Sequence, residues 1–486
     1  MKSGPKGEVR PVLEDPGIDL RLCMTRHDKD DTGANRKLAR VRLRAGFDQL
    51  VRVVLRFCAG TVALTTLFPY VSPVLITSMD VQLMALVAAL ATLFALVFVA
   101  PHLFGFCWTD LHLLALGILT LIYVDPSVQS ADPQVAIRAC APVLLGFPIY
   151  LAVRVLFRYM HPGLLVLTVA IYLAAILLQM KFPDGYTFLS SHLISEARFA
   201  PEEGRGPNGL TPERSMMGNM SILFALSILF FHRRYWQSHR VAKYFVVLGS
   251  ILMLFMTKSA TGVVLALLVA LTGTLESRLR KIHKIAVLSC VAGGIFILGQ
   301  SLNLSEARGS VALSAISSNP LTILQDYSFA TRTTNIFVGL DELSEVPFGT
   351  GDVRPNLDLA TDAFGGDLAG RIWPDATFRS YMTDVVASRD NISGVGGMIQ
   401  RMGFLGVIVG LYPIFLIRGF RGMWAVRVYA MGLLFNASMF IPTLWFMVGC
   451  STELRNLARS GLDPDSPFGF PSRPDAGSAD VRNGRP

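Results

Sequence analysis

The sequence is poor in charge. Asp, Glu, Lys and Arg together make up 16% of its 486 residues, whereas about 25% is usual for a soluble globular chain. Hydrophobic residues make up 52% of the chain, and the mean hydropathy is +0.48. This balance excludes an ordinary water-soluble protein and predicts an integral membrane protein.

The sequence also lacks the common signatures of nucleotide and metal chemistry. It contains no Walker loop and no dinucleotide-binding fingerprint, and its eight histidines are scattered singly, without the spacing of metal ligands. These absences argue against ATP-driven transport by this chain alone. We therefore predict no metal site and no cofactor.

Long apolar stretches recur along the chain. Because a helix rises 1.5 Å per residue, about 20 residues cross a hydrocarbon core of about 30 Å. About eleven such stretches predict an all-α, polytopic protein with 11 to 12 transmembrane helices. The expected spans are 55–76, 82–100, 108–124, 137–157, 162–181, 215–231, 241–257, 260–277, 284–302, 400–417 and 424–449.

The segments around these spans predict the domain organisation. No cleavable signal peptide is expected, because the first 46 residues are polar and end in a basic run. The stretch from Gly461 is rich in Pro, Asp, Gly and Ser, which is typical of disorder. The expected parts are a basic tail at 1–46, nine spans at 47–302 with an outer loop at 182–214, a large outer loop at 303–399, two spans at 400–450 and a disordered tail at 451–486.

The orientation follows from Lys and Arg in the short loops, since basic residues near helix ends stay on the cytoplasmic side. They fall in alternate loops, in phase with the basic N-terminal tail: 154–158, 233–243, 278–284 and 418–421. The intervening segments 70–80 and 125–134 contain neither residue type. We therefore predict a multi-pass membrane protein with a cytoplasmic N-terminus. Eleven spans would put the C-terminus outside, and twelve would put it inside.

The net charge of +9 does not predict a nucleic-acid partner, because the basic residues gather in the tail and inner loops, where they serve topology and contact with anionic lipid. The six cysteines predict no disulfide framework in the outer segments, since none of them lies in 182–214 or 303–399.

Arginine is the notable residue of those two outer segments. Its rigid fork matches phosphate oxygens in a bidentate way, so arginines above a bilayer favour an anionic lipid headgroup such as a diphosphate. The alternative for each is an ion pair with a neighbouring acid in solvent. The candidates are Arg198, Arg205, Arg214, Arg332, Arg371, Arg379 and Arg389. Trp373, Phe378 and Tyr381 lie among them and would either stack on sugar rings or pack a small loop core.

Helix polarity adds to this positive character. The spans that begin near Ser215, Ala260 and Gln400 are expected to run inward, so their N-termini face outward with unpaired N–H groups. Such ends bind anions. Ser215 and Ser259 are expected N-caps, and capping alone is the alternative role for Ser259 and Thr261. The expected anion-binding residues at this level are Arg214, Lys258, Ser259 and Thr261.

Four segments carry a family resemblance. Residues Arg205, Gly209, Leu210, Glu213 and Ser215 resemble the "R..GL..EPS" pattern of bacterial O-antigen and exopolysaccharide polymerases, with Arg214 in place of the usual Pro. KSATG at 258–262 resembles the "S.TG" segment that opens a helix. Arg332 followed by PFGTG at 347–351 resembles the element of the large outer loop. NISGVGGMIQRMGFLGVI from 391 resembles the segment that leads back into the membrane.

One departure separates two related families. O-antigen ligases place a His shortly before that last segment, but residues 303–399 contain no His, and Asp390, Asn391 and Ser393 stand there instead. The resemblance therefore favours a polymerase over a ligase-type glycan transferase.

The resemblance implies metal-independent glycosyl transfer on the outer face of the inner membrane. The donor and acceptor would be glycans linked to polyprenyl diphosphate, and a chain-length regulator and a flippase would be partners. It implies that Arg205 and Arg332 contact the diphosphate or hold the glycan, with Arg214 in support, and that Glu213 accepts the acceptor hydroxyl's proton. The alternative for Glu213 is a carboxylate paired with Arg214 or Arg205. A secondary transporter is the remaining alternative class, but it would carry ionisable groups within its spans, which hold almost no acids.

Overall fold

A computed structural model of the chain describes residues 31–72, 83–122, 142–194, 206–231, 233–277, 280–286, 289, 293, 327–349, 357–388, 394–420, 422–436 and 441–460. These residues form helices and no strand, apart from one isolated antiparallel bridge between Val71 and Ile194. The all-α prediction is confirmed for this part of the chain. By its internal contacts the chain divides into two units, Met1–Val53 and Val54–Pro486, and every helix after α1 belongs to the second.

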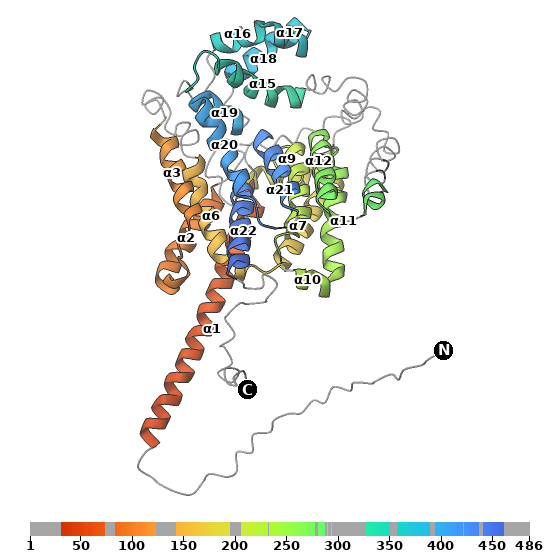
Figure 1. Ribbon diagram of the computed structural model, residues 1–486. Coiled ribbons are helices and arrows are strands. Elements are labelled where there is room, and N and C mark those ends of the chain that lie inside the picture. The colour runs from red at the N-terminus through yellow and green to blue at the C-terminus, as the bar shows by residue number, and fades with distance from the viewer. Residues whose placement is uncertain are drawn as a thin grey trace, which may run out of the picture. The chain divides into compact units, whose positions relative to one another are not determined.

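Figure 1 labels the helices, which are connected by short turns over much of the described chain. Their bounds are α1 Asp31–Leu67, α2 Met84–Val99, η1 Pro101–Leu103, α3 Trp108–Ile122, α6 Pro142–Leu156, η2 Phe157–Tyr159, α7 Gly163–Lys181, α8 Pro183–Leu193, α9 Arg214–Ser227, α10 Arg233–Ser238, α11 Arg240–Met256, α12 Ala260–Glu276, α15 Tyr327–Glu342, α16 Leu357–Gly365, α17 Asp367–Ile372, α18 Ala376–Ser388, α19 Gly394–Met402, α20 Phe404–Leu416, α21 Met423–Asn436 and α22 Pro442–Arg459.

Three helices of the described chain are long and apolar enough to cross a bilayer: Gln49–Leu67, Pro142–Tyr159 and Gly163–Lys181. Shorter apolar helices are Met84–Val99, Trp108–Ile122, Thr261–Glu276, Phe404–Leu416 and Met423–Phe435. Large apolar side chains also face outward, with Phe57 75% and Phe98 71% exposed. These features are compatible with a membrane protein, but the predicted number of spans is not confirmed. The predicted span 284–302 lies almost wholly outside the described residues.

The last predicted span, 424–449, is two helices. Helix α21 ends at Asn436, and Pro442, which has no N–H to donate and suits the first turn of a helix, opens α22. The predicted tail boundary at 451 is also too early, because α22 continues to Arg459. Its polar residues there are buried against partners: Ser451 Oγ accepts from the Arg418 N–H at 3.0 Å.

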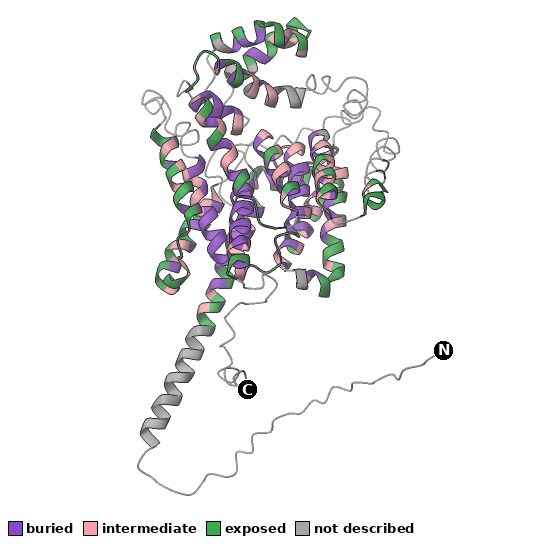
Figure 2. Cartoon of the chain, in the orientation of Figure 1, coloured by how far each residue is buried: buried purple, intermediate pink, exposed green. Residues whose placement is uncertain are grey.

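Helix α22 is buried along most of its length, as Figure 2 shows. Of its 18 residues, 14 are buried. It packs against α6, where two glycines allow the backbones to approach closely. A Cβ at Gly146 would overlap the indole ring of Trp445, and one at Gly449 would lie 2.9 Å from the carbonyl oxygen of Tyr150. The α6–α22 contact therefore depends on the absence of these side chains.

Replacement of Gly146 by alanine is expected to destabilise the protein by about 1 to 3 kcal/mol, because the fully buried Trp445 ring has no room to move. Thermal unfolding of the detergent-purified protein measures this. Gly60→Ala in α1 is the matched control, since nothing lies within 4 Å of its added Cβ, and it should be neutral or stabilising by up to about 1 kcal/mol. Equal melting temperatures for the two variants would contradict the packing described here.

One end of the helical bundle joins loops that were predicted to be cytoplasmic. Arg154 of α6 donates to the Gly105 carbonyl at 2.8 Å and pairs with Asp110 of α3 at 2.9 Å. Arg158 pairs with Glu453 of α22 at 3.0 Å. The same end includes the contacts of Arg418 with Ser451, Phe230 with Phe420, and Glu276 with Gly422. We call this group of residues the basic end; its members are Gly105, Asp110, Arg154, Arg158, Phe230, Glu276, Arg418, Phe420, Gly422, Ser451 and Glu453.

The loops predicted to face outward also contact one another. The Ser72 N–H donates to the Leu193 carbonyl at 3.0 Å, and the Gln179 side chain donates to Asn208 at 2.6 Å. Gly206 lies against the backbone of Thr257. We call this group of residues the far end; its members are Ser72, Gln179, Leu193, Gly206, Asn208 and Thr257. The described loops thus divide into two groups as the alternation of basic residues predicts, and the C-terminal turns of α22 belong to the basic end.

Within the predicted large outer loop, the described residues are helical. Helices α15 to α18 pack on one another around a small apolar core. Its buried members are Val338, Ala360, Ala363, Phe364, Ala369, Trp373 and Met382, with Phe337, Ile372 and Phe378 packed against them. Helix α15 also packs on α19, which connects this group to the rest of the second unit.

Candidate functional site

The segment 206–213 is a rigid loop at the far end. Asn208 is 3% exposed, and its backbone N–H donates to Gln179 Oε1 of α7 at 3.1 Å. The Gly209 N–H donates to the same oxygen at 3.0 Å. Asn208 Nδ2 donates to the Thr211 carbonyl at 2.8 Å, and Thr211 Oγ1 donates back to the Asn208 carbonyl at 2.8 Å. These bonds hold the loop in one conformation before any ligand arrives.

Helix α8 supports the same loop from another side. The Tyr186 hydroxyl donates to the Gly209 carbonyl. Burial raises the pKa of the Tyr186 phenol above its ordinary value, so it keeps the proton that this bond requires. Gly209 has φ = +55°, a left-handed conformation that glycine adopts without steric cost. This explains the Gly in the Gly-Leu pair that the sequence pattern contains.

Helix α9 begins directly after this loop. Its N-cap is Glu213 and not Ser215 as predicted, because the backbone of Glu213 is still extended while Arg214 is already helical. The Ser215 hydroxyl donates to the Glu213 carboxylate at 3.2 Å. A carboxylate beside a helix N-terminus is favoured by the helix dipole. Arg214 Nε donates to the Gly206 carbonyl, which orients the guanidinium at this end of α9.

Helix α12 begins with the predicted cap. Ser259 is 5% exposed, and its Oγ accepts from the Gly262 N–H at 3.1 Å. Thr261 Oγ1 lies 3.2 Å from the same hydroxyl. The prediction of Ser259 as an N-cap is confirmed. Lys258 precedes it with φ = +50°, a conformation rarely adopted by residues with a Cβ, and its side chain is exposed.

The two helix N-termini lie side by side. A Cβ on Gly218 of α9 would lie 2.9 Å from Ser259 Oγ and 3.0 Å from the Gly262 Cα, so only glycine allows this crossing. Gly206, which holds Arg214, packs on the α11–α12 turn at Met256 and Thr257. The sequence segments 204–215 and 258–262 are therefore brought together, as far as they are described.

This arrangement concentrates positive potential on one small region. Each helix N-terminus carries unpaired N–H groups and about half a positive charge. Arg214 and Lys258 each add a full charge next to these ends. Two dipole ends and two cations thus lie in one region, with the carboxylate of Glu213 at its edge, and helix N-termini of this kind favour anions.

The third predicted segment forms a separate contact. The Phe404 N–H donates to the Pro347 carbonyl at 3.0 Å, across the break between α19 and α20. Gly403 has φ = +56° there, and a Cβ on it would overlap Pro347. A glycine at this position therefore allows the two motifs to lie in direct contact. Helix α21 contacts α9 and α12 and also α19 and α15, so it connects this segment to the two helices of the paired N-termini.

The remaining predicted residues are only partly described. Arg332 lies on α15, but its side chain is not described. Three further predicted residues lie wholly outside the described residues: Arg198, Arg205 and Arg389. Arg371 is exposed at the end of α17, and Arg379 Nη1 donates to the Trp373 carbonyl. Trp373 and Phe378 belong to the small apolar core, which is the alternative that the sequence left open for them. The sequence reasoning missed Gln179 and Tyr186, whose positions within or just after an apolar run show no signal of their role.

The part of the chain that the structure describes contains no group of three or more His, Cys, Asp or Glu side chains placed to hold a metal ion. Comparisons with family models, curated proteins and solved structures found no match for this chain.

Proposed function

We propose that this chain is an integral membrane polymerase of surface polysaccharide. It would join repeat units carried on polyprenyl diphosphate, at the outer face of the bacterial inner membrane. The donor is a growing glycan on one lipid diphosphate, and the acceptor is a glycan on another. The far end would face the periplasm and the basic end the cytoplasm, with 11 to 12 membrane crossings.

One observation carries the proposal: the adjacent N-termini of α9 and α12, with Arg214 and Lys258 beside them. When the glycosidic bond to the diphosphate breaks, negative charge grows on the leaving phosphate oxygens. Fixed N–H dipoles and cations stabilise that charge without rearrangement, which is the main source of catalysis in such sites. A rigid loop bonded to Gln179 and Tyr186 keeps these groups in place.

The residue roles follow from this geometry and the family pattern. Arg214 and Lys258 hold the diphosphate of the donor, with Arg205 and Arg332 as further contacts to the diphosphate or glycan. Glu213 accepts the proton of the attacking acceptor hydroxyl, since its carboxylate lies at the edge of the same region. Arg198, Arg371, Arg379 and Arg389 are assigned to binding of the glycan.

The two alternatives differ from this proposal in specific ways. A ligase would use the same lipid diphosphate chemistry and would differ only in the acceptor. A secondary transporter would need ionisable groups near the middle of its spans. The buried ion pair of Asp110 with Arg154 joins the first turn of α3 to the last turn of α6, so it lies at helix ends.

Deletion of the gene in the source bacterium, followed by gel analysis of surface polysaccharide, tests the proposed function. We expect loss of long chains while single repeat units remain attached to their final carrier, and restoration by the intact gene. Accumulation of long chains on the polyprenyl carrier would instead identify a ligase. An unchanged gel pattern would contradict both glycan functions.

A further inference from the structure

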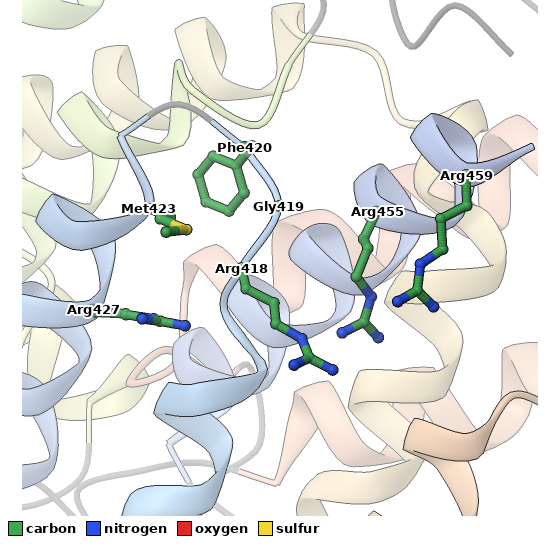
Figure 3. A pocket seen from close by; sticks show the side chains of 7 residues that line it. All are labelled: Arg418, Gly419, Phe420, Met423, Arg427, Arg455 and Arg459. Atoms are coloured by element: carbon green, nitrogen blue, oxygen red, sulfur yellow. The ribbon is translucent and has the colours of Figure 1, made fainter. Parts of the chain in front are cut away.

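A second cluster of arginines lies at the basic end. A pocket with a volume of about 640 Å³ is lined by Arg418, Gly419, Phe420, Met423, Arg427, Arg455 and Arg459. Figure 3 shows Arg418, Arg455 and Arg459 extending side by side, with Arg427 reaching in from the other side. Among the described residues, four cations and no acid line this space.

Arg455 is the deepest of the four. It is 8% exposed, and its Nη2 donates to Thr109 Oγ1 at 2.8 Å. Its Nε and Nη1 are buried and have no hydrogen-bond partner among the described residues. Leaving donors of a charged group unpaired inside a protein is costly. A ligand with anionic oxygens in the pocket would offset the buried positive charge of this guanidinium.

The other three arginines surround this position. Arg459 lies four residues after Arg455, so both project from the same side of α22, where like charges repel. Arg418 is exposed, and its backbone is held by Ser451. Arg427 is anchored by an Nε donation to the Ile417 carbonyl at 2.7 Å and lies over the Trp424 ring.

The described acids nearby are occupied elsewhere. Glu453 accepts from Arg158 at 3.0 Å. Glu276 accepts from the backbone N–H groups of Gly422 and Trp424 at 2.9 and 3.1 Å. The protein thus gathers four arginines and directs the neighbouring carboxylates to other partners. Such a cluster is expected to be stabilised by a bound polyanion.

We propose that this pocket binds a ligand carrying two or more phosphate charges, held by the guanidinium groups of Arg418, Arg427, Arg455 and Arg459. The ligand is either the headgroup of a glycerolipid with two phosphate groups or a soluble phosphate compound. Phe420 and Met423 give the same pocket an apolar wall, which suits a lipid whose glycerol and first acyl carbons follow the phosphates. The site is independent of the proposed reaction at the far end.

Binding of two probes to the full-length protein tests this proposal. The probes are cardiolipin in zwitterionic detergent, with phosphatidylcholine as the neutral reference, and inorganic pyrophosphate in the same buffer. We expect the double variant R418Q/R459Q to raise the Kd by about ten-fold for each arginine removed, because each charged hydrogen bond contributes roughly that much. Both side chains are exposed, so the variant should fold, and its melting temperature confirms this.

The matched control is Arg240→Gln, an exposed arginine at the start of α11 that lies outside the pocket. It should leave both Kd values unchanged. Tighter binding of cardiolipin than of pyrophosphate assigns the site to a lipid, and equal or tighter binding of pyrophosphate assigns it to a soluble phosphate compound. The proposal is overturned if neither probe binds in preference to phosphatidylcholine, or if R418Q/R459Q binds as tightly as Arg240→Gln.

Discussion

Replacement of Arg214 by alanine should reduce polymer elongation by about 100- to 1,000-fold, the usual cost of removing one group that stabilises charge in a transition state. Arg214 lies at the N-terminus of α9, and its Nε donation to the Gly206 carbonyl fixes the direction of the guanidinium. The adjacent N-terminus of α12 remains in place in the variant. The measurement is the rate of chain elongation by the purified protein on a polyprenyl diphosphate-linked repeat unit.

Two further variants separate charge from folding. Lys258→Asn removes the second cation, while asparagine tolerates the left-handed backbone that Lys258 adopts, so the fold should be kept and elongation should fall by about ten-fold. Lys181→Ala removes an exposed cation at the end of α7, outside the site, and should leave elongation unchanged. If Arg214→Ala and Lys181→Ala elongate at the same rate, Arg214 has no part in the reaction.

Replacement of Asp110 by asparagine should destabilise the protein by about 3 to 5 kcal/mol, because it leaves the charge of Arg154 buried without its ion-pair partner. Asp110 is 1% exposed and Arg154 5%. The carboxylate accepts from Tyr150 and from the Cys107 N–H, each at 2.8 Å, so it also fixes the start of α3. Unfolding of the purified protein in detergent, followed by circular dichroism, measures the loss.

A double variant shows whether the buried charge causes this loss. Asp110→Asn combined with Arg154→Met removes both charges, and it should recover much of the stability that Asp110→Asn loses. Arg158→Gln is the matched control: its ion pair with Glu453 is partly exposed, and its loss should cost about 1 kcal/mol. Equal stability of Asp110→Asn and the intact protein would show that the pair does not hold the basic end together.

Charge and capping patterns allow much of this arrangement to be predicted. The alternation of basic loops predicts that 204–215 and 258–262 share one end, and Ser259 is found as the cap of α12. Both predictions depend on local rules that apply to any helix end. Ser215 suits an N-cap and Glu213 does not, so the start of α9 at Arg214 depends on the loop bonded to Gln179, which local patterns do not include.

Other features depend on contacts between distant segments and could not be predicted. The run 424–449 is mostly apolar and is interrupted only by single polar residues, so its division into α21 and α22 depends on the packing of α22 against α6. In the sequence, the polar residues from Ser451 to Arg455 are typical of a C-terminal tail. In the structure they contact Thr109, Arg158 and the loop at Arg418. The four arginines of the pocket come from α21, α22 and the turn before α21. In the sequence each stands apart from the others, so nothing indicates that they share one pocket.

The central claim is that the paired N-termini of α9 and α12 bind the diphosphate of a lipid-linked glycan. Equilibrium binding of polyprenyl diphosphate and polyprenyl monophosphate to the purified protein, and to Arg214→Ala with Lys258→Asn, tests it. We predict that the intact protein prefers the diphosphate by ten-fold or more and that the double variant loses this preference. Equal binding of the two lipids by the intact protein, or an unchanged preference in the double variant, would contradict the claim.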